Sequence, residues 1–198
     1  MSLKIIPGIF SFIILISCSM LTVREGDSGE AVLSEEEKIK NHIEILVDAL
    51  ALPDNSRITK ICDKLISYKE DAIPELSKNI DNRIAIVRSS SIHCLGQIYK
   101  EYKIRRVLRY KNQIKKRLSD PLPRVRLQAA AALSYMNDYT GIPLLIEALL
   151  DESKYVRMVA SQVLFDNFNK TFGYQYYDKE EKRFQAAKKW AQWWEART

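Results

Sequence analysis

The most constraining feature of this sequence is a frame of residues that recurs three times around an arginine. With Arg88, Arg126 and Arg157 each taken as position zero, the flanking segments match without gaps from position −12 to position +7. Positions −12 and −8 are aliphatic, −6 is Asn or Asp, −1 is Val, +3 is small and +7 is Leu. In that order the residues are Leu76, Ile114 and Leu145; Ile80, Leu118 and Leu149; Asn82, Asp120 and Asp151; Val87, Val125 and Val156; Ser91, Ala129 and Ala160; and Leu95, Leu133 and Leu164. Agreement at so many positions identifies three copies of one structural unit.

Each unit has the pattern of a helical hairpin. Two aliphatic residues four apart lie on one face of a first helix, and the Val, small and Leu positions line a second helix. Between them the Asn or Asp makes a turn, helped by Pro121 and Pro123 in one copy and by Ser153 in another. One hairpin cannot cover its own apolar face, so successive hairpins must stack. Gly and Pro number only six each in 198 residues, which also favours an all-α fold.

A weaker copy of the unit precedes the three clear ones. Its residues fit the same frame, with an aliphatic side chain where the arginine would stand: Leu46, Leu50, Ile58, Ile61 and Leu65. Upstream of it, Ser34 and Glu37 have the spacing of a helix-capping box. We therefore predict a degenerate N-terminal capping repeat at 35–70, three repeats at 71–168 and a C-terminal capping helix within 169–198.

The repeated frame resembles a known family. An Asp-x5-Arg spacing with Val before the Arg, and with Pro74 and Pro143 opening first helices, resembles the HEAT repeat, in particular the short PBS lyase HEAT-like type of bacteria. The resemblance covers 71–168 well and 39–70 poorly. It implies an α-solenoid of about four HEAT-like hairpins, in which Asp and Arg are structural and form a hydrogen-bonded ladder between adjacent repeats. The ladder residues would be Arg88, Asp120, Arg126, Asp151 and Arg157, and Asn82 weakens the first rung.

The C-terminal segment extends the resemblance. A Phe172-Gly173-Tyr174 turn followed by a charged helix with spaced tryptophans is similar to the cap of many bacterial HEAT proteins. One helical stripe of this helix would close the last apolar face, and it contains Phe184, Ala187, Trp190, Ala191 and Trp194. The alternative is that the Trp and Tyr side chains stack on sugar rings of an envelope glycan. Trp193 lies off the stripe and is the candidate for an exposed aromatic contact.

The N-terminal residues have the pattern of a bacterial lipoprotein signal. Lys4 precedes an apolar run that is too short to span a bilayer, and Leu-Ile-Ser then leads directly to Cys18, which resembles a lipobox. We expect a signal peptide at 1–17, a lipidated Cys18, and an acidic flexible tether at 18–34 that reaches about 20 Å. The protein would be lipid-anchored in the bacterial cell envelope. Ser19 in place of Asp permits an outer-membrane location under the enterobacterial sorting rule.

A basic segment is not explained by stacking. Arg88 and Arg126 are 38 residues apart, whereas Arg126 and Arg157 are 31 apart, and the extra residues fall in 100–117. Nine of the eighteen residues there are basic and one is acidic: Lys100, Lys103, Arg105, Arg106, Arg109, Lys111, Lys115, Lys116 and Arg117. One interpretation is a positive patch for anionic lipid or another envelope polyanion. The other is an elongated, solvated helix whose cations only maintain solubility.

Catalytic chemistry finds little support in the sequence. His42 and His93 are the only histidines, and no HExxH, CxxC or phosphate-binding loop is present. We predict no catalytic residue, no metal, no cofactor and no small-molecule substrate. Cys62 and Cys94 fall in the second helices of neighbouring units, where they are either buried free thiols, which the frame favours, or a disulfide.

The predicted function is that of a non-enzymatic, membrane-anchored scaffold lipoprotein that binds a protein partner. The alternative is a cytosolic protein that binds nucleic acid through the basic segment 100–117, and it requires that the N-terminal signal be misread. An enzyme subunit is a third option, for which no catalytic residue can be named.

Overall fold

The computed structural model describes residues 33–52 and 54–197, and every regular element in them is helical. Six long helices, the six-residue helices α3, α5 and α7, and short 3-10 turns (η) follow one another along the described residues. Their bounds are α1 Glu35–Ala49, α2 Asn55–Ser67, η1 Lys69–Ala72, α3 Ile73–Lys78, α4 Ala85–Tyr102, η2 Arg105–Tyr110, α5 Lys111–Lys116, η3 Arg117–Ser119, α6 Pro123–Tyr135, η4 Tyr139–Gly141, α7 Ile142–Glu147, η5 Ala148–Leu150, α8 Lys154–Phe168 and α9 Glu180–Glu195. The predicted all-α class is confirmed.

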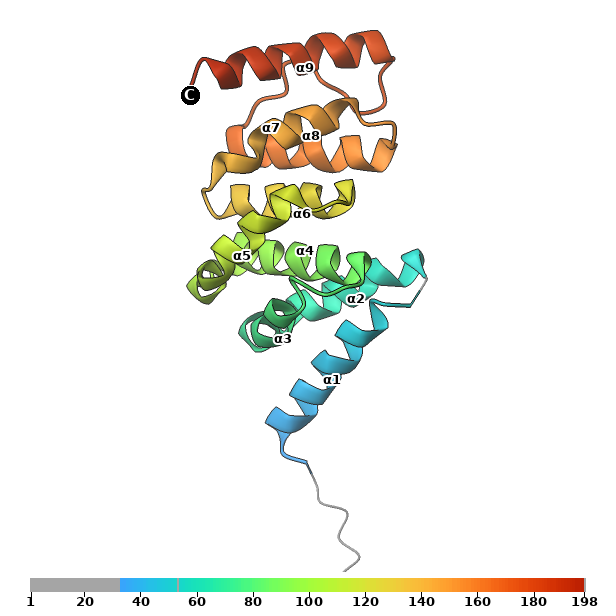
Figure 1. The fold of residues 1–198 in the computed structure, drawn as a ribbon, viewed down its shortest axis with the longest axis vertical. Helices are drawn as coiled ribbons and strands as arrows, with labels where there is room; N and C mark the ends of the chain where they lie inside the picture. The colour runs from blue at the N-terminus through green and yellow to red at the C-terminus, as the bar shows by residue number, and fades with distance from the viewer. Residues whose placement is uncertain (1–32, 53, 198) are drawn as a thin grey trace, which may run out of the picture. The chain divides into compact units, whose positions relative to one another are not determined.

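The helices pair as hairpins that stack in chain order (Figure 1). The pairs are α1 with α2, α3 with α4, α5 with α6, and α7 with α8, and α9 closes the stack. The first helices α3, α5 and α7 are each only six residues long and are extended by 3-10 turns. The second helices α4, α6 and α8 are longer and continuous. This is the arrangement of an α-solenoid.

The frame arginine closes the turn inside its own hairpin. Arg88 Nη1 donates to the carbonyl oxygens of Asn82 and Arg83, at 2.8 and 3.1 Å. Arg126 and Arg157 make the same two bonds to the carbonyls six and five residues before them. At position −6 the Asn or Asp side chain accepts from the backbone N–H two residues later in all three copies. The frame therefore encodes one hydrogen-bonded turn three times.

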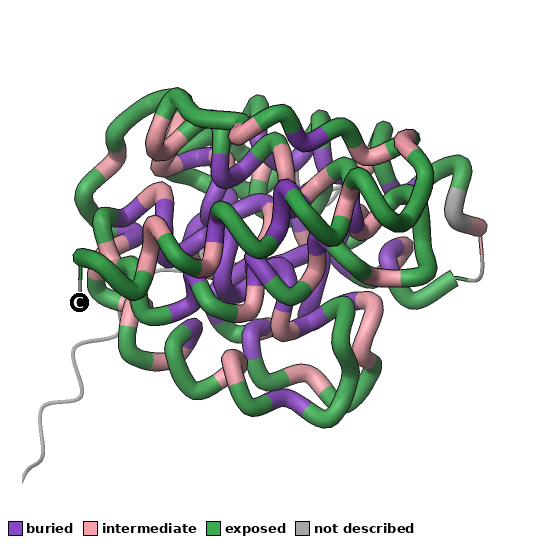
Figure 2. The backbone as a smooth tube through the Cα atoms, turned by 90° about the horizontal axis from the view of Figure 1, so that it is seen from above, coloured by how far each residue is buried: buried purple, intermediate pink, exposed green. Residues whose placement is uncertain are grey.

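Apolar residues of the frame form the core. Positions −12, +3 and +7 are fully buried in all three repeats, and buried residues line the interior where the hairpins meet (Figure 2). α4 and α6 approach each other closely, since a Cβ placed on Gly96 would lie 2.9 Å from the Cα and Cβ of Ala132. A side chain larger than hydrogen at Gly96 would push these two helices apart.

The capping box that the sequence predicts at Ser34 and Glu37 is present. The Ser34 hydroxyl accepts from the Glu37 amide, and the Glu37 carboxylate accepts from the Ser34 amide, which completes a capping box at the start of α1. Residues 33–198 form a compact unit separate from 1–32. The predicted signal peptide 1–17, the lipidation site Cys18 and nearly all of the tether 18–34 lie outside the described residues.

The C-terminal helix is a further second helix of the repeat. Arg183 Nη1 donates to the carbonyl five residues earlier, at 3.0 Å, and Ala186 and Trp190 at +3 and +7 are buried. The segment between α8 and α9 replaces the first helix, and the Tyr174 hydroxyl in it donates to the Leu149 carbonyl. The predicted stripe is wrong at Phe184, which is 50% exposed, because position +1 of the frame faces outward here.

Candidate functional site

A groove crosses the second helices of four consecutive hairpins. Its volume is about 530 Å³, and we call it the second-helix groove. It is lined by residues of α2, α4, α6 and α8: Ile58, Thr59, Cys62, Asp63, Ser89, Ser90, His93, Arg124, Gln128, Tyr155, Met158 and Val159. A surface to which four repeats each contribute a few side chains is typical of the binding faces of solenoids.

Large apolar side chains form the α8 wall of the groove. Tyr155 is 53% exposed and Met158 is 39% exposed, although both line the cavity. Phe165, one to two turns further along α8, is 42% exposed. The three residues lie at helical spacing on one face, so they form an apolar row on α8 that no described element covers. Rows of this kind on a soluble surface mark interaction sites.

Small and polar residues form the floor of the groove. Ser89 and Ser90 replace the bulkier residues that other second helices carry, and beside them His93 Nδ1 lies 3.2 Å from the Gln128 amide oxygen. Burial lowers the pKa of His93, and the bond to Gln128 opposes this only in part. His93 is therefore a neutral imidazole at neutral pH. Its Nδ1–H donates to Gln128, which leaves Nε2 as a hydrogen-bond acceptor.

The two thiols lie behind this floor as free cysteines. Cys62 and Cys94 are both buried, and the Cys94 Sγ lies 3.9 Å from the Cys62 carbonyl oxygen. A hydrogen bond from the Cys94 thiol lowers the pKa of Cys62, and the same bond, together with burial, raises the pKa of Cys94. The preference for free thiols over a disulfide is thus confirmed.

Two opposite charges flank the groove without pairing. Asp63 lies on α2 and Arg124 on α6, both line the cavity, and within the described residues neither takes part in an ion pair. Both act on His93 between them: Asp63 favours its protonated form and Arg124 disfavours it. The lining of the groove therefore contains one negative and one positive side chain without an ion-pair partner among the described residues.

The predicted basic patch at 100–117 is largely neutralised by acidic residues of other repeats. The printed sequence does not reveal this, because the partners are distant along the chain. Lys100 pairs with Asp166 at 2.6 Å, Arg106 with Glu70 at 3.4 Å, Lys111 and Lys115 with Asp138 at 3.5 Å, and Arg117 with Asp81 and Asp120 at 3.3 and 3.4 Å. Lys103 lies over the Tyr99 ring. Among the described residues, Arg105, Arg109 and Lys116 make no ion pair.

The segment is also not the elongated helix of the second interpretation. α4 ends at Lys103, whose φ of 55° is left-handed, and the chain then forms the 3-10 turn η2 before the short helix α5. Val107 is fully buried beneath this turn. The extra residues of this repeat therefore build a compact protrusion that is anchored to the core.

The predicted ladder has one complete carboxylate rung. Arg88 Nε and Nη2 donate to the two carboxylate oxygens of Asp120, at 3.0 and 2.9 Å, across the junction between repeats. Arg157 donates through Nε to the Tyr176 carbonyl instead. Between Arg126 and Asp151 no bond forms, and both residues line a cavity of about 370 Å³. The expectation of a rung at every junction is corrected: this junction is too open for it.

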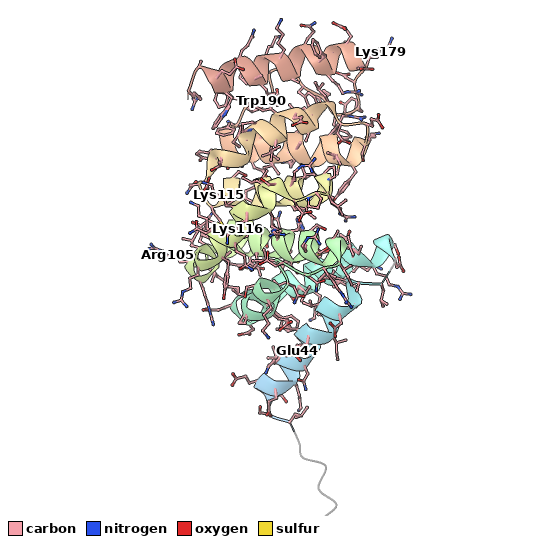
Figure 3. The ribbon with its side chains drawn as sticks, in the orientation of Figure 1. Glu44, Arg105, Lys115, Lys116, Lys179 and Trp190 are labelled. Carbon is pink, nitrogen blue, oxygen red and sulfur yellow. The ribbon has the colours of Figure 1, made fainter. Side chains whose placement is uncertain are left out.

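Trp193 is half-buried rather than exposed, which corrects the prediction. Its ring lies 5.0 Å from that of Phe168 and 5.5 Å from that of Trp190 between centroids. Arg197 covers another part of it, with the guanidinium carbon 4.1 Å from the ring centroid. Trp190 itself lies between α9 and the helices next to it (Figure 3). The tryptophans therefore close the core, which leaves no open aromatic platform for a sugar ring at Trp193.

The geometry gives no sign of a reaction centre in the described part of the chain. No group of three or more His, Cys, Asp or Glu residues there has the arrangement of a metal site. His42 is exposed and does not line the groove. Its Nδ1 lies 2.7 Å from the Tyr68 hydroxyl oxygen. None of the helices between residues 33 and 197 is long and apolar enough to cross a bilayer.

Sequence reasoning missed the groove, although the signal for it is present. At position −2 the frame has Ile86, Arg124 and Tyr155, and at +1 it has Ser89, Leu127 and Met158. These positions vary in chemistry while their neighbours at −1, +3 and +7 stay apolar or small. Variation at fixed positions of a conserved frame marks the face that the stacking does not use.

Together, stacked hairpins and a groove across their second helices define an α-helical repeat protein with an interaction surface. Within it, residues 112–166 match the family described as HEAT repeats. This region spans the α5–α6 and α7–α8 hairpins and includes Asp120, Arg126, Asp151 and Arg157. HEAT repeats generally serve as protein-interaction modules and are typically not catalytic. No curated protein matches the chain.

Proposed function

We propose that this protein is a non-enzymatic scaffold lipoprotein of the bacterial cell envelope, anchored through Cys18, which binds a protein partner in the second-helix groove. The anchor is supported by the lipobox-like end of the apolar run at 5–16. The binding role is supported by the groove and by the HEAT repeats at 112–166.

One observation carries the binding role. Tyr155 and Met158 expose apolar surface at a groove that is also lined by Asp63 and Arg124, neither of which has an ion pair within the described residues. A stable fold that leaves such side chains uncovered gains free energy when a partner covers them. Tyr, Met and Arg are also the residue types that are enriched at the centres of protein interfaces.

The alternative function, nucleic-acid binding through the basic segment 100–117, is weakened by the ion pairs of that segment. Five of the nine cations in 100–117 already pair with carboxylates of this chain. A groove for a phosphate backbone needs a continuous run of free cations, and the remaining four, Lys103, Arg105, Arg109 and Lys116, do not provide one.

Mass spectrometry of the N-terminus of the purified protein tests the anchor. The expected mass is that of a chain that begins at an acylated Cys18, and Cys18→Ala is expected to abolish acylation and release the protein from membranes. An unmodified chain that still begins at Met1 would refute the envelope location.

Site-specific photocrosslinking in the native cell tests the groove. A photoreactive amino acid at Met158 is expected to capture one protein partner, and the crosslink is expected to disappear in the Arg124→Glu variant. A matched control places the same amino acid at Tyr177, which is 61% exposed and lies outside the groove. Equal capture at both positions would mean that the groove has no selectivity, and the proposed binding role would fail.

A further inference from the structure

The arginine turn, by which we mean Arg105, Arg106 and Arg109 on η2, is a positive site that the described residues neutralise only in part. These three residues and Glu70 line a cavity of about 360 Å³. Arg106 shares its charge with Glu70, whereas Arg105 and Arg109 have no ion pair within the described residues. The cavity therefore carries two positive charges in excess.

The turn is held rigidly, so its charges need little ordering on binding. Val107 is fully buried, and Ile104 and Leu108 pack partly buried against the same core cluster. With these three side chains directed inward, the arginines at the remaining positions face outward. Arg105 projects away from the helices in Figure 3. Rigid placement of planar guanidinium groups favours bidentate binding of phosphate oxygens.

Neighbouring cations are paired with carboxylates, which reduces the positive potential around the turn. Asp166 holds Lys100, Asp138 holds Lys111 and Lys115, and Asp81 with Asp120 holds Arg117. The sequence presents nine similar cations, but the fold separates them into a paired set and a small free set. Selective pairing of this kind leaves one localised anion site.

The location of the turn indicates where the anion comes from. Arg106 also lines a second cavity, of about 490 Å³, together with Glu36, Ile39 and Lys40 of α1. The arginine turn thus lies beside the helix with which the folded unit begins. In the proposed function the tether from the lipidated Cys18 joins the unit at this helix, so a bilayer surface would be within about 20 Å of it.

We infer that the arginine turn binds the phosphate groups of anionic phospholipid headgroups and forms a second, electrostatic contact between the folded unit and the membrane. A basic patch is a common second membrane signal beside a covalent lipid anchor. The two contacts would also fix which face of the stack the groove presents. This inference rests on the proposed function for the presence of a membrane.

Vesicle co-sedimentation of residues 19–198 tests the inference without the lipid anchor. This polypeptide retains the whole compact unit 33–198, and circular dichroism confirms its folding. Vesicles of phosphatidylcholine with one quarter phosphatidylglycerol are expected to bind it, and vesicles of pure phosphatidylcholine are not. Each arginine near an anionic surface contributes about fivefold to the partition constant, so Arg105→Gln/Arg109→Gln is expected to lower it roughly 25-fold.

A control matched in charge separates a specific site from net charge. Lys188→Gln/Lys189→Gln removes two exposed, unpaired cations from α9, at the other end of the stack, and is expected to change binding less than about twofold. Equal losses in both variants would overturn the inference, and so would equal binding to both kinds of vesicle. Binding of a DNA or RNA duplex through the same arginines, with no binding to vesicles, would also overturn it. Because the polypeptide lacks Cys18, these outcomes are independent of the test of acylation.

Discussion

Loss of the Arg88–Asp120 rung should destabilise the protein strongly, and the chain provides its own control for the measurement. The side chain of Asp120 is fully buried and that of Arg88 is 10% exposed. The carboxylate accepts two bonds from Arg88, one from the Leu122 amide and a longer one, of 3.4 Å, from Arg117 Nη1. In Asp120→Asn the amide can still accept from Leu122, but the buried guanidinium loses its counter-charge.

Breaking a buried ion pair on one side costs about 3–5 kcal/mol. Arg88 keeps its two bonds to backbone carbonyls, so we expect a loss of about 3 kcal/mol. Asp151→Asn is the matched control, since Asp151 has the same frame position and accepts from the Ser153 amide but has no bond to Arg126. Its expected cost is under about 1 kcal/mol, the value of an exposed turn contact.

Urea unfolding monitored by circular dichroism measures the free energy of unfolding of both variants. A loss for Asp120→Asn no larger than that for Asp151→Asn would refute the argument that the rung holds the repeats together. The pH dependence gives a second measurement. Burial alone would raise the pKa of Asp120, but the bonds from Arg88 and Leu122 outweigh burial and lower it. Stability from this group is therefore present above the ordinary pKa of an aspartate and is lost as the pH falls through the lowered value. Asp120→Asn should lack that acid-side loss.

Three further predictions concern packing and protonation. Gly96→Ala should cost about 1–3 kcal/mol because the added methyl overpacks against Ala132. This cost opposes a gain in helix propensity of about 1 kcal/mol, so we expect a net loss of stability in thermal unfolding. Unchanged stability would show that α4 and α6 can move apart at no cost. Trp190→Ala should cost about 3–5 kcal/mol of stability because the ring is fully buried. Thermal unfolding followed by circular dichroism measures this loss, and a loss below about 1 kcal/mol would mean that α9 does not close the core. Burial lowers the pKa of His93, so its contribution to stability is present above pH 6.5, the ordinary value, and decreases as the pH falls below it. His93→Gln should flatten this part of the pH dependence of the free energy of unfolding. An unchanged pH dependence would contradict a buried neutral imidazole.

The repeating part of the fold was predictable because the hairpin is encoded locally. Hydrophobic spacing, the Asn or Asp turn and the arginine that closes it all lie within one frame of twenty positions, and the three copies adopt the same hydrogen bonds. The α9 repeat was not recognised, because the chain replaces its first helix with an irregular segment and has Lys182 where the frame has Val. Without the aliphatic pair at −12 and −8, the remaining arginine, small and large apolar positions are too few to stand out.

Properties of the junctions between repeats were not predictable from the frame. Arg88, Arg126 and Arg157 have identical local settings, yet they face a carboxylate, an open cavity and a backbone carbonyl. The difference depends on how closely adjacent hairpins approach, which many side chains decide together. The ion pairs of the basic segment also depend on how the hairpins pack, because their acidic partners lie in other repeats. Lys100 meets Asp166 only because α4 and α8 present these side chains toward each other across the stack.

The tightest junction and the arginine turn belong to the same part of the stack, and the packing explains why. Gly96 lets α4 approach Ala132 of α6 closely, and this approach brings Asp120 within bonding distance of Arg88. With α4 and α6 so close, the extra residues between them cannot insert into the stack and must protrude at its edge, where Val107 is fully buried and Ile104 and Leu108 are partly buried against the core. The insertion therefore protrudes from the stack and is anchored to the core by its buried side chains. The free arginines are consequently displayed beside the junction at which Arg88 bonds to Asp120, whereas at the next junction Arg126 and Asp151 line an open cavity and form no bond.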